Sequence, residues 1–224
     1  MKLTFLGTGA ADWNAAEHGR LEGFRRNSSL LIDDCLLIDP GPDVPEALKT
    51  FHKDIGAIRY ILNTHPHSDH YCAATVSALT SATLYPVTEG EALTVGPYTV
   101  TALPASHGTC RPTVHFLISD GTHSLFYGLD GAWLTYEEVQ AIWKTHVNYA
   151  VLDATVGFVE GDYRIFEHND LNMVIEIARS LRAHVGRFCI SHMARTLHTD
   201  HATLAAAMAP YGIEVAFDGY EAEL

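Results

Sequence analysis

The chain has 224 residues, of which 47% are hydrophobic and 18% are charged. This length and composition predict one globular domain over residues 1–224, with no disordered signature and no apolar run of membrane-spanning length. The formal net charge of −13 disfavours a nucleic-acid-binding groove, because Lys and Arg side chains hold phosphate backbones.

The cysteines indicate the cellular compartment, and the many histidines suggest metal binding. The four cysteines (Cys35, Cys72, Cys110 and Cys189) lie far apart and form no CxxC pair. This spacing predicts reduced thiols, and an amino terminus without the apolar core of a signal peptide makes the cytoplasm the expected compartment. The chain also has 14 histidines, as many as Lys and Arg together, and metal binding is one use of such a surplus.

The first third of the chain predicts alternating strands and helices. A strand over residues 1–7 precedes a hairpin of two short strands over 27–33 and 34–41. A helix is predicted over 43–53, with Asp43 as its N-cap and Pro45 in its first turn. A buried strand over 58–65 and a helix over 71–81 follow.

The rest of the chain is first rich in predicted strands, and its last third alternates between helices and strands. Further strands are predicted over residues 82–87, 98–107, 113–119 and 123–130. Helices over 135–146, 171–184 and 200–212 then alternate with strands over 149–155, 186–193 and 213–219. This order predicts an α/β fold of stacked sheets with helices outside.

The segment "NTHPHSDH" crowds His65, His67, Asp69 and His70 into six positions directly after a predicted strand. Imidazole and carboxylate groups suit zinc, iron or manganese, and the lack of a neighbouring cysteine disfavours a structural zinc knot. A polar loop in a histidine-rich chain is the alternative interpretation, but a chance HxHxDH is rare at this length.

"THPHSDH" resembles the HxHxDH signature of the metallo-β-lactamase superfamily, and the resemblance extends over the whole chain. It implies an αββα sandwich of the metallo-β-lactamase type with two metals at one edge of the sheets. It also implies further ligands downstream in the order His, Asp, His. "LPASHG", "FYGLDG" and "CISHM" supply these as His107, Asp130 and His192.

The resemblance implies a dinuclear site. The first metal would be held by His65, His67 and His107, and the second by Asp69, His70 and His192, with Asp130 bridging the two. Two divalent cations, two carboxylates and a bridging hydroxide would leave a net charge of about +1, which attracts anions. Zinc or manganese is expected in preference to iron.

The opening "MKLTFLGTGAA", the phrase "NSSLLI" and the ending "GIEVAFDG" are similar to one branch of the superfamily. This branch contains phosphoribosyl 1,2-cyclic phosphate phosphodiesterase and pyrroloquinoline-quinone biosynthesis protein B. The chain departs from the cyclic phosphodiesterase in having no cysteine over residues 11–27, where that enzyme has a structural zinc site. It also lacks a basic insertion that could serve as the arm of the related transfer-RNA endonucleases.

These features predict a dinuclear metal-dependent hydrolase, and more finely a phosphodiesterase for a small phosphate ester, such as a cyclic one. The expected nucleophile is a metal-bridging hydroxide that Asp69 orients, and His168 would donate a proton to the leaving alkoxide. His168 precedes a predicted helix at a position where phosphodiesterases of the superfamily have an additional active-site histidine. A surface residue at a helix start is the alternative interpretation.

Four other functions remain open. They are a lactone or thioester hydrolase on the same metals, an iron-dependent oxidoreductase, a non-catalytic ligand carrier, and transfer-RNA processing with a steep salt dependence. The expected partner is a small anionic substrate, while nucleic acid and membrane are not expected partners. The oligomeric state stays open, a dimer included.

Other polar residues have two interpretations each. Arg25 and Arg26 in "FRRNSS" would contact an anion or lie in a solvated loop. His198 and His201 would contact the substrate or a metal ligand, or belong to a polar loop and helix cap. The other histidines considered are interpreted as surface or hydrogen-bonded core residues: His52, His115, His123, His146 and His184.

Overall fold

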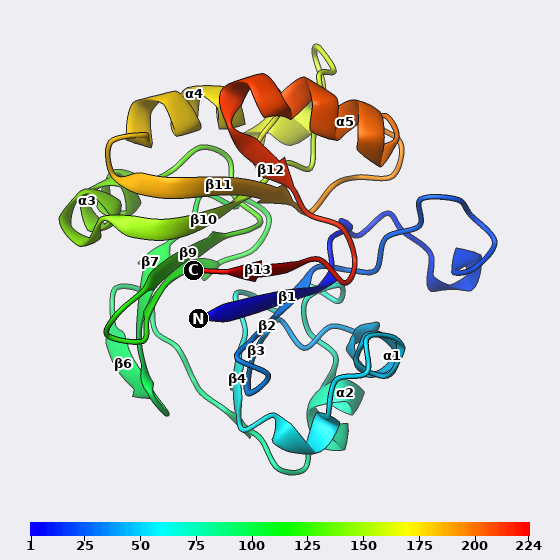
Figure 1. Cartoon of the computed structure of the whole chain (residues 1–224), viewed down its shortest axis with the longest axis vertical. Coiled ribbons are helices and arrows are strands. Elements are labelled where there is room, and N and C mark those ends of the chain that lie inside the picture. The colour runs from blue at the N-terminus through cyan, green and yellow to red at the C-terminus, as the bar shows by residue number, and fades with distance from the viewer.

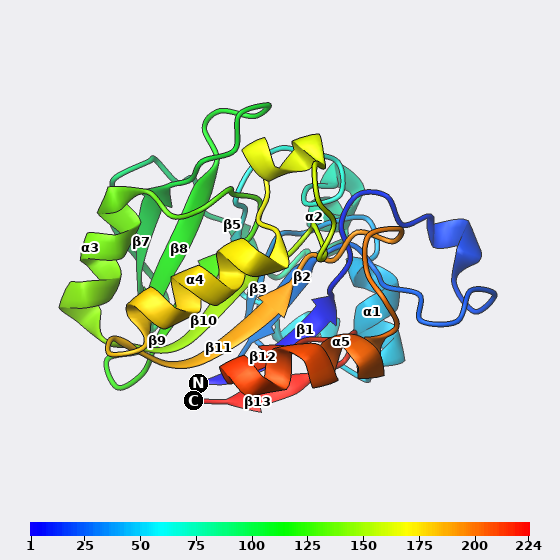
Figure 2. The same ribbon diagram turned by 90° about the horizontal axis from the view of Figure 1, so that it is seen from above.

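The computed structural model describes all 224 residues and contains two stacked β-sheets with helices on both outer faces (Figure 1). The first sheet has the strand order β13-β1-β2-β3-β4-β5, and the second has the order β12-β11-β10-β9-β8-β7-β6. Seen from above, α3, α4 and α5 lie over the second sheet (Figure 2). The predicted αββα sandwich is confirmed.

The first half of the chain supplies most of the first sheet. Its elements are β1 (Lys2–Gly7), β2 (Ser29–Ile32), β3 (Leu36–Ile38), α1 (Val44–Thr50), β4 (Tyr60–Leu62), α2 (Ala73–Ala78) and β5 (Thr83–Leu84). β2 and β3 form the predicted antiparallel hairpin, whereas β3, β4 and β5 run parallel. Asp43 precedes α1 as predicted, but its carboxylate accepts a hydrogen bond from the Asn27 N–H and does not cap the helix.

The rest of the chain, from residue 92 on, builds the second sheet and adds the edge strand β13 to the first. Its elements are β6 (Ala92–Val95), β7 (Tyr98–Pro104), β8 (Val114–Ser119), β9 (Ser124–Gly128), α3 (Tyr136–Thr145), β10 (Val147–Asp153), α4 (Leu171–Leu181), β11 (Val185–Ser191), α5 (His201–Met208), β12 (Ile213–Val215) and β13 (Glu221–Glu223). Strands β6 to β9 pair antiparallel, and β9 to β12 pair parallel. The edge strands β6 and β13 were not predicted, because they are short and largely exposed.

The core follows the two-residue period of the strands. Along β10, Tyr149 and Val151 pack between the two sheets, whereas Ala150 and Leu152 pack against the helices on the outer face. Burying one such large apolar side chain contributes about 1.5–3 kcal/mol. Because β7 and β9 to β11 all run in the same direction, the loops that follow them meet at one edge of the sandwich.

The structure contains neither a disulfide nor a helix that could cross a membrane. All four cysteines are free thiols, and Cys189 is buried. No helix is both long and apolar enough to span a bilayer, and the longest, α4, has 11 residues.

The adjacent arginines Arg25 and Arg26 are buried, so their interpretation as part of a solvated loop is wrong. Their exposed fractions are 8% and 5%. Arg26 donates a hydrogen bond to the Thr50 hydroxyl and lies 3.5 Å from the carboxylates of Glu46 and Asp218. Arg26 therefore ties the loop before β2 to α1 and to the segment between β12 and β13.

His115 forms a buried ion pair with Glu138, which agrees with its interpretation as a hydrogen-bonded core residue. Its Nδ1 contacts the Glu138 carboxylate, and its Nε2 lies 3.1 Å from the Leu129 carbonyl oxygen. Glu138 also accepts a hydrogen bond from the Thr135 N–H in the capping box of α3. The pair therefore links β8, α3 and the loop after β9.

The His115–Glu138 pair predicts a pH-dependent stability. Burial lowers the pKa of His115, but the Glu138 carboxylate outweighs it, so the pKa lies above the ordinary 6.5. Such a group stabilises the fold fully below pH 6.5, and this contribution is lost as the pH rises through the folded-state pKa. We expect His115→Gln to lower the free energy of unfolding by about 3–5 kcal/mol at pH 6 and by less at high pH. Urea denaturation measures both, with His123→Gln as the control; a difference independent of pH would contradict the prediction.

Candidate metal centre

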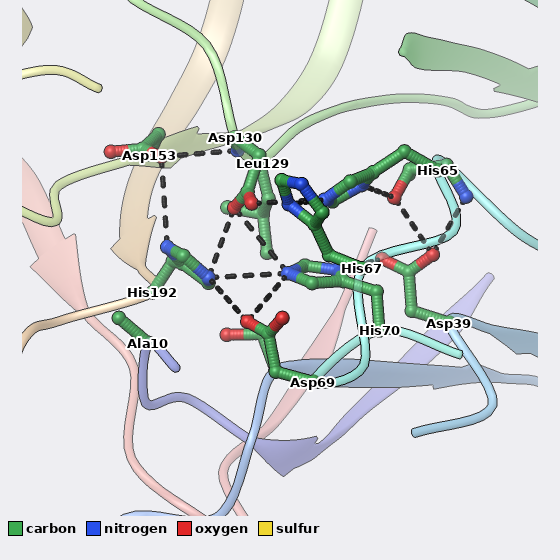
Figure 3. Close-up of polar contacts among 12 residues, drawn as sticks. Ala10, Asp39, His65, His67, Asp69, His70, Leu129, Asp130, Asp153 and His192 are labelled. Carbon is green, nitrogen blue, oxygen red and sulfur yellow. Dashed lines mark hydrogen bonds and ion pairs between the residues drawn. The ribbon is translucent and has the colours of Figure 1, made fainter. Parts of the chain in front are cut away.

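All seven residues predicted from the sequence as metal ligands lie together at one edge of the sandwich. Figure 3 labels all of them except His107. Their donor atoms form two sets, and within each set the atoms lie within 4.8 Å of one another. One set comprises His65, His67, His107 and Asp130, and the other comprises Asp69, His70, Asp130 and His192. The loops after β4, β7, β9 and β11 supply these residues.

The first set converges on the Oδ2 atom of Asp130. His65 Nε2 lies 3.2 Å from this oxygen and 3.0 Å from His67 Nδ1. His107 Nε2 lies 3.3 Å from His67 Nδ1 and 3.9 Å from Asp130 Oδ2.

The second set converges on the other carboxylate oxygen, Asp130 Oδ1. His192 Nε2 lies 2.9 Å from this oxygen, and His70 Nε2 lies 3.4 Å from it. The two imidazole nitrogens are 3.2 Å apart, and Asp69 Oδ2 lies 3.3 Å from His70 Nε2. One carboxylate is therefore shared between the two sets.

The geometry of both sets fits bound cations. A tetrahedral zinc ion with ligands at about 2.0–2.1 Å separates its ligand atoms by about 3.3 Å, close to the distances within both sets. Asp130 Oδ1 is buried and accepts no hydrogen bond, although imidazole nitrogens surround it. Imidazole and carboxylate donors of this kind suit divalent zinc or manganese.

The carboxylates of the cluster are ionised. Burial raises the pKa of Asp69 and of Asp130, but neighbouring histidines outweigh burial and hold both carboxyl groups well below their ordinary 3.8. Burial lowers the pKa of His192, but chiefly Asp130 outweighs it and raises the pKa to about 10. The negative charge of the carboxylates therefore favours cations at this edge.

Asp39 orients the histidines and was not recognised from the sequence. Its Oδ2 lies 2.9 Å from His70 Nδ1, and its Oδ1 accepts hydrogen bonds from the Thr64 N–H at 2.8 Å and the Thr64 hydroxyl at 2.9 Å (Figure 3). The same hydroxyl contacts His65 Nδ1. Asp39 thereby fixes the tautomer of His70 that directs the Nε2 lone pair into the cluster.

Removing the Asp39 carboxylate should weaken metal binding. We expect Asp39→Asn to lower zinc affinity about 10- to 100-fold, as such outer contacts of metal ligands typically do. Competition with a chromophoric chelator measures the affinity, and Asp54→Asn, an exposed carboxylate on another loop, is the control. Equal affinities in the two variants would show that Asp39 does not orient His70.

Asp153 is a second carboxylate that sequence reasoning missed. It ends β10, is fully buried, and accepts hydrogen bonds from the Asp130 N–H at 3.0 Å and the Thr155 N–H at 2.8 Å. Its Oδ2 also lies 2.8 Å from His168 Nδ1. The signal in the sequence was a carboxylate at a strand end in "YAVLDAT", the same context as that of Asp130.

His168 lies beside the cluster and is largely buried, with 14% of its side chain exposed. Its ring stacks on that of His192, with the centroids 5.6 Å apart. Burial lowers the pKa of His168, but Asp153 outweighs it, and the pKa is raised above 6.5. The interpretation as an exposed helix-start residue is therefore wrong.

The donor atoms open into a pocket of about 230 Å³. Its other lining residues include Asp12, Thr109, Arg164, Glu167 and His168. The Arg164 guanidinium is bound by the Asp162 carboxylate at 2.8 and 2.7 Å. The volume lies below the roughly 300–1,000 Å³ of typical ligand pockets, so the pocket suits a small substrate.

His198 and His201 belong to neither donor set. His198 Nε2 lies 2.7 Å from the Ala154 carbonyl oxygen, and thereby links the loop after β11 to the loop after β10. His201 is the exposed first residue of α5, which Asp200 caps.

Comparisons with known proteins agree with this geometry. Residues 22–108 match the family model of the metallo-beta-lactamase superfamily. The chain has the metallo-β-lactamase fold. The resemblance found in the sequence is thus confirmed. No curated protein sequence matches the chain.

Three solved structures illustrate the likeness in the metallo-β-lactamase fold. A diphosphatase from the PhnP family has a TM-score of 0.75 at 18% identity, over 100% of this chain and 96% of that one. Zinc-bound PqqB from Methylobacterium extorquens has a TM-score of 0.75 at 17% identity, over 100% of both chains. Human tRNase Z, short form, has a TM-score of 0.74 at 16% identity, over 100% and 99%. They include the branch suggested by the sequence, and at these identities they establish the fold.

Proposed function

We propose that the protein is a dinuclear metal-dependent hydrolase and that its substrate is a small phosphodiester. The observation that carries this proposal is the shared carboxylate of Asp130. Its Oδ2 faces His65 Nε2, while its Oδ1 faces His192 Nε2 and His70 Nε2. A carboxylate between two sets of nitrogen donors favours two cations side by side.

The ligands for these cations would be the seven residues of the two sets. When bound, the cations would neutralise phosphoryl oxygens and lower the pKa of bound water. Asp69 directs Oδ2 toward His70 and His192, and its Oδ1 accepts no hydrogen bond from the protein (Figure 3). Asp69 Oδ1 would therefore orient the attacking water by accepting its hydrogen bond.

His168 would be the proton donor to the leaving oxygen. Asp153 holds Nδ1 at 2.8 Å, which leaves Nε2 without a partner in the protein on a side chain that lines the pocket. An alkoxide has a high pKa, so a positioned acid helps a phosphodiester bond to break. The Asp153 carboxylate behind the imidazole raises the pKa of His168, which favours the protonated form that a proton donor requires.

Pocket size and charge support a small anionic substrate over a nucleic acid. The pocket of about 230 Å³ has one arginine, which Asp162 already binds. With 27 acidic and 14 basic residues, the chain lacks the cations that a long phosphate backbone requires. A diphosphatase among the similar structures also supports phosphate chemistry.

Metal quantification and a substrate panel on one preparation test the proposal. We expect two zinc or manganese ions per chain, and hydrolysis of bis-p-nitrophenyl phosphate but not of lactones or thioesters. Faster turnover of lactones or thioesters would indicate that the hydroxide attacks a carbonyl carbon and not phosphorus. Bound iron with oxygen consumption would indicate an oxidoreductase, and ligand retention without hydrolysis would indicate a carrier.

A further inference from the structure

A second pocket lies next to the candidate metal centre, between the loop before β2 and the loop after β11. Its volume is about 310 Å³, and Ala194 lines both pockets. In Figure 2 the blue loop that follows β1 lies beside the orange segment that leads to α5. Its polar side chains include Trp13, Glu22, Arg25, Thr199 and His201.

Arg25 lines this pocket, and part of its guanidinium group makes no hydrogen bond within the protein. Its Nη1 donates hydrogen bonds to the Thr8 hydroxyl at 2.6 Å and to the Ala216 carbonyl at 2.9 Å. Its Nε and Nη2 donate no hydrogen bond within the protein, although the residue is only 8% exposed. These two groups form one edge of the guanidinium, the edge with which Arg164 and Arg187 bind carboxylates elsewhere in the chain.

No carboxylate pairs directly with Arg25, and Asp218 acts on its charge only from beyond 4.0 Å. Arg25 is the one buried arginine without a carboxylate within 4.0 Å, whereas Arg26 lies 3.5 Å from two. The Asp218 carboxylate favours the charged form of Arg25 from a distance, but it accepts hydrogen bonds from the Thr8 hydroxyl and the Arg26 N–H and none from Arg25. Burying a cation whose N–H donors have no partner costs free energy unless an anion pairs with it.

We propose that this pocket binds an oxyanion the size of a phosphate group, with Arg25 Nε and Nη2 as its bidentate donors. A guanidinium edge matches the spacing of two phosphate oxygens. Thr199 from the loop after β11 and His201 from the start of α5 line the same pocket and supply further polar groups. Two carboxylates line the pocket as opposing charges. Asp200 accepts hydrogen bonds from the Thr203 N–H and hydroxyl, whereas Glu22 is exposed and makes no hydrogen bond.

The anion has two possible sources. It is either a second anionic group of the substrate, since the pocket adjoins the metal centre, or free phosphate that acts as an effector. Binding at Arg25 does not depend on the proposed hydrolysis; only its assignment to the substrate rests on that function.

Calorimetric titration of the metal-loaded protein with inorganic phosphate tests the site directly. We expect an Arg25-dependent site in the wild type that weakens at least tenfold in Arg25→Gln, separate from any phosphate bound at the metals. Glu22→Gln should strengthen this site about two- to fivefold, because it removes a partly screened repulsion. Arg20→Gln, an exposed arginine outside the pocket, is the matched control.

The same phosphate isotherm in wild type and Arg25→Gln would overturn the proposal. If Arg25→Gln does not fold, Glu22→Gln decides, because an exposed side chain without hydrogen bonds is dispensable for folding. An unchanged isotherm in Glu22→Gln would then overturn the proposal.

Kinetics with two matched esters separate the sources. Both are p-nitrophenyl phosphodiesters of glycerol, and one carries an additional phosphate monoester. If the anion belongs to the substrate, Arg25→Gln lowers kcat/KM at least tenfold more for the doubly charged ester than for the other. If the anion is an effector, inorganic phosphate changes the rate of the simple ester in the wild type more than in Arg25→Gln. Phosphate binding at Arg25 without hydrolysis of any ester would refute the proposed function and leave this site standing.

Discussion

Asp130→Ala is expected to lose bound metal and to hydrolyse bis-p-nitrophenyl phosphate at least about a thousandfold more slowly than the wild type. Removing one electrostatic stabiliser of a transition state costs roughly 10²–10³ in rate, and this variant removes the one carboxylate that both donor sets share. Without it, the nitrogen donors of the two sets have no common anion to hold two cations together. Metal content per chain and initial rates measured on the same sample test the prediction.

The Asp130 experiment needs a control for folding. Asp54→Ala removes an exposed carboxylate from a loop away from the cluster, and it should keep metal and rate. Circular dichroism compares the fold of both variants with the wild type. Full metal occupancy in a folded Asp130→Ala protein would remove Asp130 from the proposed ligands.

His168→Ala is expected to keep its metals and to lose activity in a way that depends on the leaving group. Turnover of an alkyl phosphodiester should fall at least about a hundredfold, because a positioned acid contributes roughly 10²- to 10⁴-fold. Turnover of a p-nitrophenyl ester should fall much less, since p-nitrophenolate is a stable leaving group that needs little protonation. Steady-state kinetics on both esters, with metal analysis, measure the difference.

Two further variants test whether the effect of His168→Ala comes from proton donation by His168. His123→Ala removes a partly exposed histidine at the turn between β8 and β9 and should change neither ester. Asp153→Asn weakens the contact that raises the pKa of His168, so it should shift the basic limb of the alkyl-ester pH–rate profile to lower pH. Equal losses on both esters in His168→Ala would indicate phosphate binding in place of acid catalysis.

Local patterns in the sequence determined the type and order of most elements and the first four candidate ligands, and the family resemblance added the other three. The segment "IRYILNTH" carries both signals, because its short apolar run predicts a buried strand and the polar residues at its end belong to a strand-end loop. Four of the seven candidate ligands come from one segment, and His107, Asp130 and His192 each lie at the end of a predicted strand. Strand direction then brings these loops to one edge, so the motif and the resemblance together sufficed to name the residues of the cluster.

Only the tertiary structure decided which polar residues support that cluster and which contacts each of the two adjacent arginines makes. Asp39 and Asp153 have no motif of their own, and their roles come from contacts with His70 and with His168 and Asp130. Arg25 and Arg26 are adjacent and chemically identical, yet only Arg26 has carboxylates within 4.0 Å. Arg25 instead meets a carbonyl 191 residues away. Burial and partners of this kind depend on contacts between distant segments, which local composition and periodicity do not encode.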